Sequence, residues 1–351
     1  MDATAGTPPG FRPPVYPYER LAPLAARAAG LPGGLVDLSV GTPTDPPPPA
    51  LVHALAAADG AGTVRGYPPS AGTDTLRRAA AAWIERRFGC PVDAAAVAAC
   101  VGTKEFVATL PQWLKLRQPG RDTVLVPAVA YPTYRMGAVL AGLRVVAVPA
   151  DKEFRLDLSA VGEDDARRAL LVWANSPGNP CGQLEDLAEV VRFGRRYGVV
   201  VASDECYAEF TWTGEPRTVL AEGGQGVIAL HSLSKRSNAA GLRVGWYAGD
   251  GDLIAYLREV RKHAGLMVPG PAQLAAAAAL ADDDHVEAQR GRYRRRLERL
   301  AQMFSALGSD APLPDGGFYL WAPAPGGDEW EFTERLAVTG GLLVSPGEFY
   351  G

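Results

Sequence analysis

Lys235 can react with the carbonyl group of a phosphorylated compound, and its neighbours can bind the phosphate. Lys235 follows an apolar run, 227–230, that is typical of a buried strand. A buried ammonium group loses its hydration, so a lysine here is costly unless its amine reacts. Condensation with an aldehyde removes that cost, and the hydroxyls of Ser232 and Ser234 and the guanidinium of Arg243 can hold a phosphate beside it. Taken alone, the pattern also fits a surface turn with a solvated lysine.

Other polar residues follow other short apolar runs. Asp204, after the run 199–203, would be a carboxylate that needs a cationic partner, for which a protonated ring nitrogen is suitable. An N-cap is its alternative role. The stretch 175–182 contains two asparagines and two prolines, which favours a rigid loop that can aim the Asn179 amide at a ligand oxygen.

Further candidate positions are turns and loop aromatics. Gly102 opens a helix whose free amides suit a phosphate, or it begins an ordinary N-cap. Tyr131 can stack on a flat ring or cover the core. The turn at Gly41 leaves a backbone amide accessible to a ligand carboxylate, or it is a plain turn. Tyr67 lies in a loop before a helix, where it can contact a ligand or pack against the protein.

The elements that must position these residues follow an alternating pattern. Short β-branched runs alternate with helix-like segments near 105–116, 133–143 and 185–197, and another helix is expected near 73–88. This order predicts an α/β fold with a mostly parallel seven-stranded sheet and helices on both faces, in which ligands bind beyond the carboxyl ends of the strands. The predicted strands are 97–101, 123–126, 144–148, 170–173, 199–202, 227–230 and 244–248.

The ends of the chain predict a smaller second α/β unit. Residues 318–321 and 342–344 have the pattern of strands, and 329–338 that of a helix. We expect an N-terminal arm and part of the small domain in 1–45, a large domain in 46–270, and a C-terminal small domain, cut short, in 271–351. The proline-rich residues 1–18 should be extended.

Composition excludes several classes of protein. The 351 residues have a formal net charge of −4 and no dominant basic field, which argues against a nucleic-acid or anionic-membrane partner. No apolar run is long enough to span a bilayer, and the first residues lack the pattern of a secretory signal. The four cysteines have no metal-ligand spacing, so we expect no metal site and a reduced, cytoplasmic protein.

Taken in order, the motifs are a glycine turn, an aromatic residue, N-P-x-G, D-x-x-Y, S-x-S-K and a later arginine. This order resembles the fold type I pyridoxal-phosphate enzymes, specifically the class I and II aminotransferases, from Gly41 to the last residue. The resemblance implies pyridoxal 5′-phosphate as the cofactor and amino and keto acids as substrates. It also implies a homodimer in which Tyr67 reaches the phosphate in the neighbouring subunit.

The resemblance implies a role for each candidate residue. Lys235 matches the Schiff-base lysine, Asp204 the carboxylate that pairs with the pyridine nitrogen, and Tyr207 a catalytic hydroxyl. Tyr207 and Asn179 together match the pair that hydrogen-bonds the ring hydroxyl. Tyr131 matches the stacking aromatic, and Gly41 the amide that meets the substrate carboxylate. The phosphate cup would comprise Gly102, Thr103, Lys104, Ser232 and Arg243.

Within that family, the sequence is most similar to actinobacterial succinyldiaminopimelate aminotransferases. The stretches that carry this resemblance are 37–43, 203–207, 231–238, 261–265 and 346–351. It implies exchange of an amino group between glutamate and N-succinyl-2-amino-6-ketopimelate in lysine biosynthesis. The chain departs from the family at Cys181, where threonine is usual, and it ends before the arginine that pairs with the substrate α-carboxylate, so weak substrate binding is expected.

Three alternative functions are also compatible with the sequence. The first is an aminotransferase for aspartate or aromatic amino acids. The second is a carbon–sulfur β-lyase, which would use the same lysine and aspartate but release ammonia without a keto-acid acceptor. The third is a cofactor-binding sensor module without catalytic activity, against which the absence of a preceding basic helix-turn-helix segment counts.

Overall fold

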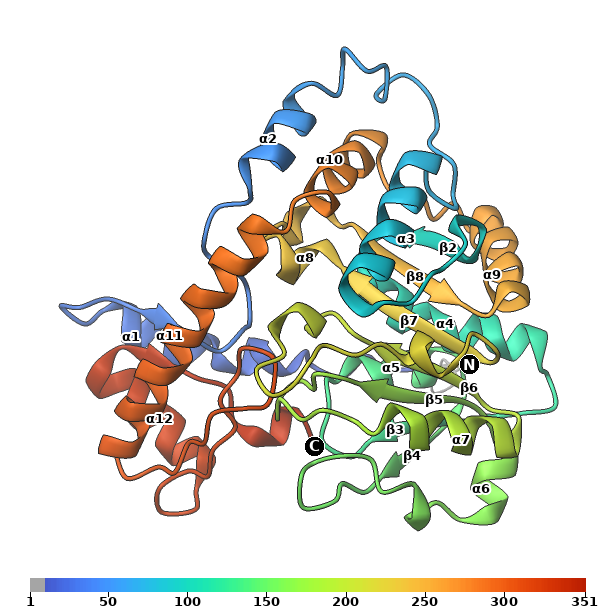
Figure 1. Cartoon of the computed structure of the whole chain (residues 1–351). Coiled ribbons are helices and arrows are strands. Elements are labelled where there is room, and N and C mark those ends of the chain that lie inside the picture. The colour runs from blue at the N-terminus through green and yellow to red at the C-terminus, as the bar shows by residue number, and fades with distance from the viewer. Residues whose placement is uncertain (1–9) are drawn as a thin grey trace, which may run out of the picture. The chain divides into compact units, whose positions relative to one another are not determined.

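The computed structural model describes residues 10–351 and divides into two compact units. One unit comprises the chain up to Gly41 together with Ala324–Phe349, and the other comprises Thr42–Pro323 with Tyr350–Gly351. Residues 1–9 of the predicted extended arm lie outside the described residues. The larger unit carries a twisted sheet flanked by helices (Figure 1).

Seven strands of the described residues form one sheet in the larger unit, in the order β2-β8-β7-β6-β5-β3-β4. β8 is antiparallel to both of its neighbours, and the other pairs are parallel, which confirms the predicted mostly parallel sheet. The strands are β2 (Val97–Cys100), β3 (Thr123–Pro127), β4 (Arg144–Val148), β5 (Ala169–Asn175), β6 (Val200–Asp204), β7 (Val227–Ser232) and β8 (Gly245–Gly249).

Helices cover both faces of this sheet, as predicted. On one face, α4 (Thr103–Arg117), α5 (Thr133–Leu140) and α9 (Gly251–His263) form one buried apolar cluster with the strands. On the other face, α7 (Leu187–Tyr197) packs on β3, β5 and β6, and α3 (Asp74–Phe88) and α10 (Gly270–Leu280) pack near β2 and β8. The remaining helices of this unit are α2 (Pro49–Ala56), α6 (Glu163–Arg168), α8 (Leu233–Arg236) and α11 (Asp284–Ala306).

Local sequence signals set the helix ends. The Thr73 hydroxyl accepts the Leu76 N–H at the start of α3, and Asp186 caps α7 by accepting the Glu189 N–H. Each of these helices ends at a glycine with positive φ, Gly89 at 67° and Gly198 at 64°, a conformation that glycine adopts at little cost. The polar loops between strands and helices are thereby held at fixed places.

The smaller unit pairs the start of the chain with its end. β1 (Val36–Asp37) lies parallel to β9 (Leu342–Leu343), and α1 (Ala22–Ala29) packs with α12 (Glu329–Gly340). The short 3-10 turns η1 (Pro17–Leu21) and η7 (Gly347–Phe349) also belong to it. The predicted helix 329–338 and strand 342–344 are confirmed.

The strand predicted at 318–321 is wrong. Gly316 forms a single bridge with Thr211, and Phe318–Trp321 continues as an irregular segment. The residues just before this segment are held by loops: Gly317 donates its N–H to the Phe210 carbonyl, 2.9 Å away. The aromatic residues of this segment therefore pack on neighbouring aromatic rings, such as those of Tyr207 and Tyr293, and not across a sheet.

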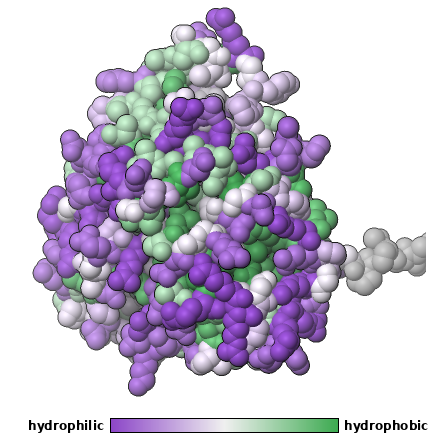
Figure 2. Space-filling view, turned by 45° about the vertical axis from the view of Figure 1, so that its right-hand side comes forward, coloured by the Kyte–Doolittle hydropathy of each residue, from purple (hydrophilic) through white to green (hydrophobic). Residues whose placement is uncertain are grey.

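None of the helices in residues 10–351 is long and apolar enough to cross a membrane. The face shown in Figure 2 is mostly hydrophilic, with small apolar areas between the polar side chains.

Candidate active site

Three neighbouring strands end on polar residues, and this brings the candidate residues to one edge of the sheet. β5 ends at Asn175, β6 at Asp204 and β7 at Ser232, and Asn175 is the direct register partner of Asp204. The runs predicted from apolar residues alone stop earlier, because the last residues of each strand are polar although they are buried. The carboxyl ends of parallel strands thus carry the site, as in other open α/β sheets.

Lys235 sits in a single short helix directly after β7. Ser232 caps this helix, its Oγ accepting the Ser234 N–H at 3.1 Å. The Lys235 Nζ lies 5.6 Å from the centre of the Phe318 ring. Burial lowers the pKa of Lys235 to about 8, while the nearby Cys206 and Asp204 oppose this shift and Arg243 adds to it. A larger fraction of neutral amine is therefore available near neutral pH than an exposed lysine would offer.

Asp204 is buried at the end of β6 and is held by groups from two other segments. The Tyr134 hydroxyl on α5 donates to its Oδ2 at 2.9 Å, and the Cys206 N–H donates to its Oδ1 at 3.2 Å. Burial raises the pKa of Asp204, while these hydrogen bonds and the charge of Lys235 act in the opposite direction. A bound cation facing this carboxylate would hold it in the ionised state.

Asn175 joins the Asp204 strand to the loop that carries Asn179. The Asn175 Nδ2 donates to the Asp204 carbonyl oxygen at 2.8 Å, and its Oδ1 accepts the Asn179 N–H at 2.7 Å. Among the described residues, the buried Asn179 Oδ1 has no hydrogen-bond partner. Because buried polar atoms are nearly always hydrogen-bonded, an unpaired side-chain oxygen here indicates that a bound ligand supplies the missing partner.

Gly102, at the N-terminus of α4, and Arg243, before β8, form a cradle. Gly102 has a φ of 72°, and a Cβ there would lie 2.2 Å from the Arg243 Nη2. The Arg243 guanidinium donates to the carbonyls of Ala240 and Val101 at 3.0 and 3.4 Å and is exposed. A guanidinium beside the first amides of a helix is suited to a phosphate group.

We predict that Gly102→Ala weakens cofactor binding at least about tenfold, which corresponds to about 1.4 kcal/mol. The new methyl group must displace the Arg243 guanidinium. Gly142→Ala is the matched control, because Gly142 has a similar φ of 66° with nothing within 4 Å of its ideal Cβ. Equilibrium dialysis of both variants measures the effect; equal affinities would show that the cradle does not hold the cofactor.

The remaining candidates lie in different surroundings. Tyr131 is half-buried, its ring lies 6.0 Å from that of Tyr134, and the Lys104 Nζ is 5.9 Å from its centre. The Thr103 hydroxyl meets the Cys206 thiol at 3.2 Å. Tyr67 is 96% exposed in the loop between α2 and α3, so it does not join this group. Gly41 closes the smaller unit, and its role stays a prediction.

Sequence reasoning missed three contacting residues. Tyr134 comes three residues after the candidate Tyr131, but this spacing does not indicate that its hydroxyl reaches Asp204. Asn175 was part of the quoted loop, but only the strand register makes it the neighbour of Asp204. Tyr319, whose hydroxyl lies 2.7 Å from that of Tyr207, is too distant in sequence for any local signal.

Comparison with known proteins identifies the family. The sequence pattern described as aminotransferase class I and II matches residues 34–351. The chain belongs to this family. Members depend on pyridoxal 5′-phosphate, so this aminotransferase is a pyridoxal-phosphate-dependent transaminase with the fold type I architecture.

Named relatives of this aminotransferase cover most of its length. It is 45% identical to the 4-dedimethylamino-4-oxo-anhydrotetracycline transaminase OxyQ of Streptomyces rimosus, over 96% of this chain and 92% of that protein. It is 35% identical to the LL-diaminopimelate aminotransferase of Desulforudis audaxviator, over 96% and 88%. A solved structure, a probable N-succinyldiaminopimelate aminotransferase from Thermus thermophilus, matches with a TM-score of 0.85 and 31% identity, over 95% and 92%.

The residues at this edge fit the cofactor of the family. The unpartnered Asn179 Oδ1, the buried Asp204 carboxylate and the cradle at Gly102 are features that a ring and its phosphate would complete. The lowered pKa of Lys235 suits an amine that must react with an aldehyde. Each feature is an observation on this chain, independent of the family match.

A buried acid–imidazole pair lies directly beneath the site. The Glu205 Oε2 is 3.4 Å from the His231 Nε2, and its Oε1 accepts the Val219 N–H at 2.7 Å. Burial raises the pKa of Glu205 to about 8 and lowers that of His231 to about 3. Burial therefore favours the neutral form of both side chains and disfavours a second negative charge beside Asp204.

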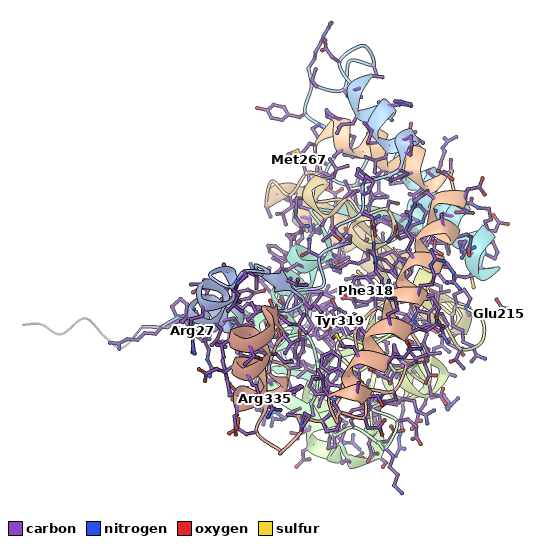
Figure 3. All side chains as sticks on the ribbon, turned by 90° about the vertical axis from the view of Figure 1, so that its left-hand side faces the viewer. Arg27, Glu215, Met267, Phe318, Tyr319 and Arg335 are labelled. Carbon is purple, nitrogen blue, oxygen red and sulfur yellow. The ribbon has the colours of Figure 1, made fainter. Side chains whose placement is uncertain are left out.

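The Glu205 carboxyl makes stability fall as pH rises, whereas the lowered pKa of His231 acts in the opposite direction below about pH 6.5. Glu205 keeps its proton in the folded state up to about pH 8 but releases it near 4.5 when unfolded, so folding is progressively disfavoured between these values. Relative to the wild type, Glu205→Gln should gain up to about 1.4 kcal/mol for each pH unit across this window. Urea unfolding at pH 6 and pH 8 measures the gain. Glu215→Gln, at an exposed position (Figure 3), is the control; parallel pH profiles for Glu205→Gln and the wild type would refute the assignment.

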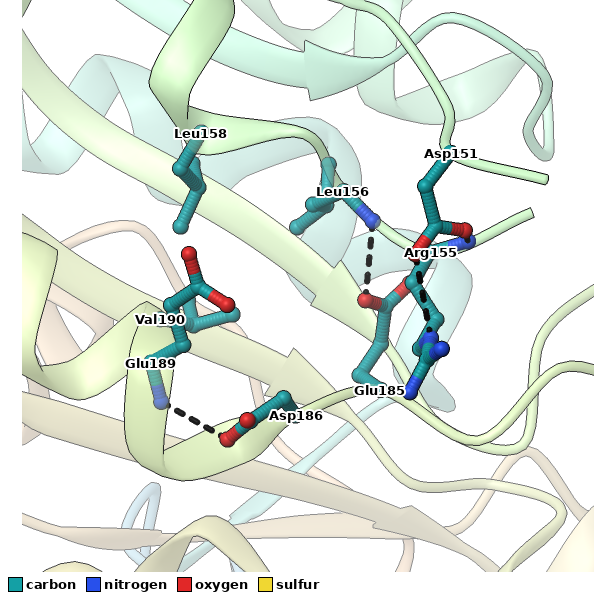
Figure 4. A pocket seen from close by; sticks show the side chains of 8 residues that line it. All are labelled: Asp151, Arg155, Leu156, Leu158, Glu185, Asp186, Glu189 and Val190. Atoms are coloured by element: carbon teal, nitrogen blue, oxygen red, sulfur yellow. Dashed lines mark hydrogen bonds and ion pairs between the residues drawn. The ribbon is translucent and has the colours of Figure 1, made fainter. Parts of the chain in front are cut away.

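A separate pocket of about 200 Å³ lies beside α7 (Figure 4). Two of its carboxylates have structural partners: Glu185 accepts the Leu156 N–H at 3.0 Å, and Asp186 caps α7. Burial raises the pKa of Glu185 to about 7. These two carboxylates therefore serve local structural contacts, and the pocket lining contains no lysine like that found after β7.

Proposed function

We propose that Lys235 binds pyridoxal phosphate covalently and then moves the substrate proton. When bound, the cofactor supplies an electron sink for the charge left when the α-proton of an amino acid is removed. Lys235, released by the incoming substrate amine, would act as the general base at the substrate Cα. Its position in a capped helix over the Phe318 ring and its lowered pKa support this role.

Asp204 would hold a proton on the pyridine nitrogen. Ionised Asp204 favours the protonated ring by a charge-assisted hydrogen bond, and the hydrogen bonds from Tyr134 and Cys206 orient its two oxygens. Asn179 and Tyr207 would bind the ring oxygen, and Tyr131 would stack on the ring. The Asn179 Nδ2 would be the donor to that oxygen, and this placement of the ring is supported by the Oδ1 of the same amide, which has no hydrogen-bond partner within the described residues.

The phosphate would lie at the start of α4, between the amides of Thr103 and Lys104 and the Arg243 guanidinium, with Ser232 and Gly102 completing the cup. The 96% exposure of Tyr67 supports its role in the site of a neighbouring subunit, and hence a homodimer. The Gly41 amide would receive the substrate carboxylate.

For the substrates, we infer glutamate as the amino donor and N-succinyl-2-amino-6-ketopimelate as the acceptor. The stretches at 37–43 and 231–238 support this, as does the similarity to a probable N-succinyldiaminopimelate aminotransferase. The LL-diaminopimelate relatives act on a chemically related diamino diacid. A second candidate acceptor is the oxo group of a polycyclic compound, which is favoured by the 45% identity to OxyQ.

The cofactor spectrum tests the reaction and the substrate separately. Glutamate should convert the visible band of the lysine-bound cofactor to the pyridoxamine form. Adding N-succinyl-2-amino-6-ketopimelate should restore the band and release its aminated product, identified by mass spectrometry. Restoration only by a 4-oxo-anhydrotetracycline would reject the first acceptor in favour of the second. Release of ammonia with no acceptor would indicate a β-lyase instead.

A further inference from the structure

The hydroxyl groups of Tyr207 and Tyr319 lie 2.7 Å apart, and either can be the donor. Tyr207 is buried and follows Asp204 by one turn, whereas Tyr319 is half-buried and comes from the irregular segment near the end of the larger unit. Figure 3 shows Tyr319 beside Phe318, the aromatic residue whose ring centre lies 5.6 Å from the Lys235 Nζ. A second phenol thus reaches the site from a distant part of the sequence.

The segment that carries Tyr319 is held rigidly against two loops of the site. The Gly316 N–H donates to the Gly182 carbonyl at 2.8 Å, and the Trp212 Nε1 donates to the Gly317 carbonyl at 2.7 Å. A Cβ at Gly316 would lie 2.5 Å from the Pro177 ring, so this approach requires glycine. The position of the Tyr319 ring is therefore fixed by the same loop that holds Asn179.

The two rings also pack directly on one another. The Tyr207 ring meets those of Phe318 and Tyr319 edge-on, at 5.2 and 5.6 Å between centres. Packing alone would hold these rings with phenylalanine at both positions, so the hydroxyl pair is an additional feature. A hydrogen bond in such apolar surroundings is stronger than in water and polarises the next bond in a chain.

We propose that Tyr319 is a positioning residue that donates its hydroxyl proton to the Tyr207 oxygen and thereby directs the Tyr207 O–H toward the ring oxygen of the cofactor. This inference rests on the role of Tyr207 in the proposed function. A phenol has a single proton, so when Tyr207 donates to the ring oxygen, its contact with Tyr319 must be an accepted one. Tyr319 then fixes the torsion of the Tyr207 hydroxyl and strengthens its donation.

The proposal predicts a spectroscopic shift. A donor on the ring oxygen withdraws negative charge from it, which makes the adjacent lysine nitrogen easier to deprotonate. Weakening this donor should therefore raise the pKa at which the visible band of the lysine-bound cofactor titrates. We expect Tyr207→Phe to raise this pKa clearly, because it removes the donor. Tyr319→Phe should raise the pKa by about 0.3 to 0.5 unit, because one hydrogen bond strengthens the next in a chain by about 10–30%.

The decisive experiment is a double-mutant cycle on the holoenzyme. Tyr319→Phe should shift the titration in the wild-type background and leave it unchanged in the Tyr207→Phe background, because its effect passes through the Tyr207 hydroxyl. Tyr293→Phe is the control: Tyr293 packs on the same Phe318 ring, but its hydroxyl donates to the Asn238 Oδ1. Its removal should not move the titration.

Three results would overturn the inference: no shift with Tyr319→Phe, an equal shift in both backgrounds, or an equal shift with Tyr293→Phe. A visible band that never forms in the wild type would instead refute the proposed function. If the band forms but Tyr207→Phe leaves its titration unchanged, the role of Tyr207 and this inference fail together, while the role of Lys235 stands. Far-ultraviolet circular dichroism and cofactor content of each variant check that it is folded.

Discussion

Lys235→Ala should retain pyridoxal phosphate only noncovalently and lose turnover by more than about 10⁴-fold, because one substitution removes both the attachment point and the general base. Borohydride reduction followed by mass spectrometry measures attachment, and steady-state assays with glutamate measure turnover. The pKa of about 8 adds an expectation for the wild-type apoenzyme: reaction with the cofactor should accelerate as pH rises through 8, well below the value for an exposed lysine.

Lys262→Ala is the control for this experiment. Lys262 is a surface residue on α9 that forms an exposed ion pair with Glu259, so its removal should leave both attachment and turnover unchanged. Near-normal turnover in Lys235→Ala, or a borohydride-reduced adduct on another lysine, would show that the assignment of Lys235 is wrong.

Asp204→Ala should lower the rate by about 10³-fold or more, since loss of the carboxylate leaves the ring nitrogen without the charge that keeps it protonated. The most direct measurement is the rate of exchange of the substrate α-proton with deuterium, which reports on the step that the ring must support. Cofactor binding should persist, because the phosphate cradle and Lys235 are intact in this variant.

Tyr134→Phe separates the charge of Asp204 from its orientation. This substitution removes only the 2.9 Å hydrogen bond to Oδ2 and leaves the carboxylate in place, so it should cost no more than about tenfold in rate. If Asp204→Ala and Tyr134→Phe lowered the exchange rate equally, Asp204 would serve a structural purpose and the proton on the ring nitrogen would need another partner.

The sheet and much of the site could be predicted from the sequence because the signals are local. Apolar runs mark the strands, and polar residues that follow a run, such as Asp204, mark the edge where a ligand can bind. The contacts among these residues could not be predicted, because they depend on register and on packing between segments far apart in sequence. Asn175 meets Asp204 through the pairing of β5 with β6, and Tyr319 meets Tyr207 through a loop.

The error at 318–321 has the same origin. Aromatic residues are enriched in strands, but here the backbone groups just before the segment are bonded to the loops at Gly182 and Phe210. Tertiary contacts therefore override the local pattern. The aromatic side chains of this segment pack around the site and not across a sheet.

The pairing of β2 with β8 has a consequence for how the enzyme matures. The cradle lies between the helix that follows β2 and the arginine that precedes β8. These two strands are neighbours in the sheet, although a large part of the larger unit separates them along the chain. Such distant contacts form late, because the loop between them must first be ordered. Phosphate binding should therefore mark the completion of the sheet, and a ribosome-bound chain that ends before β8 should not capture the cofactor.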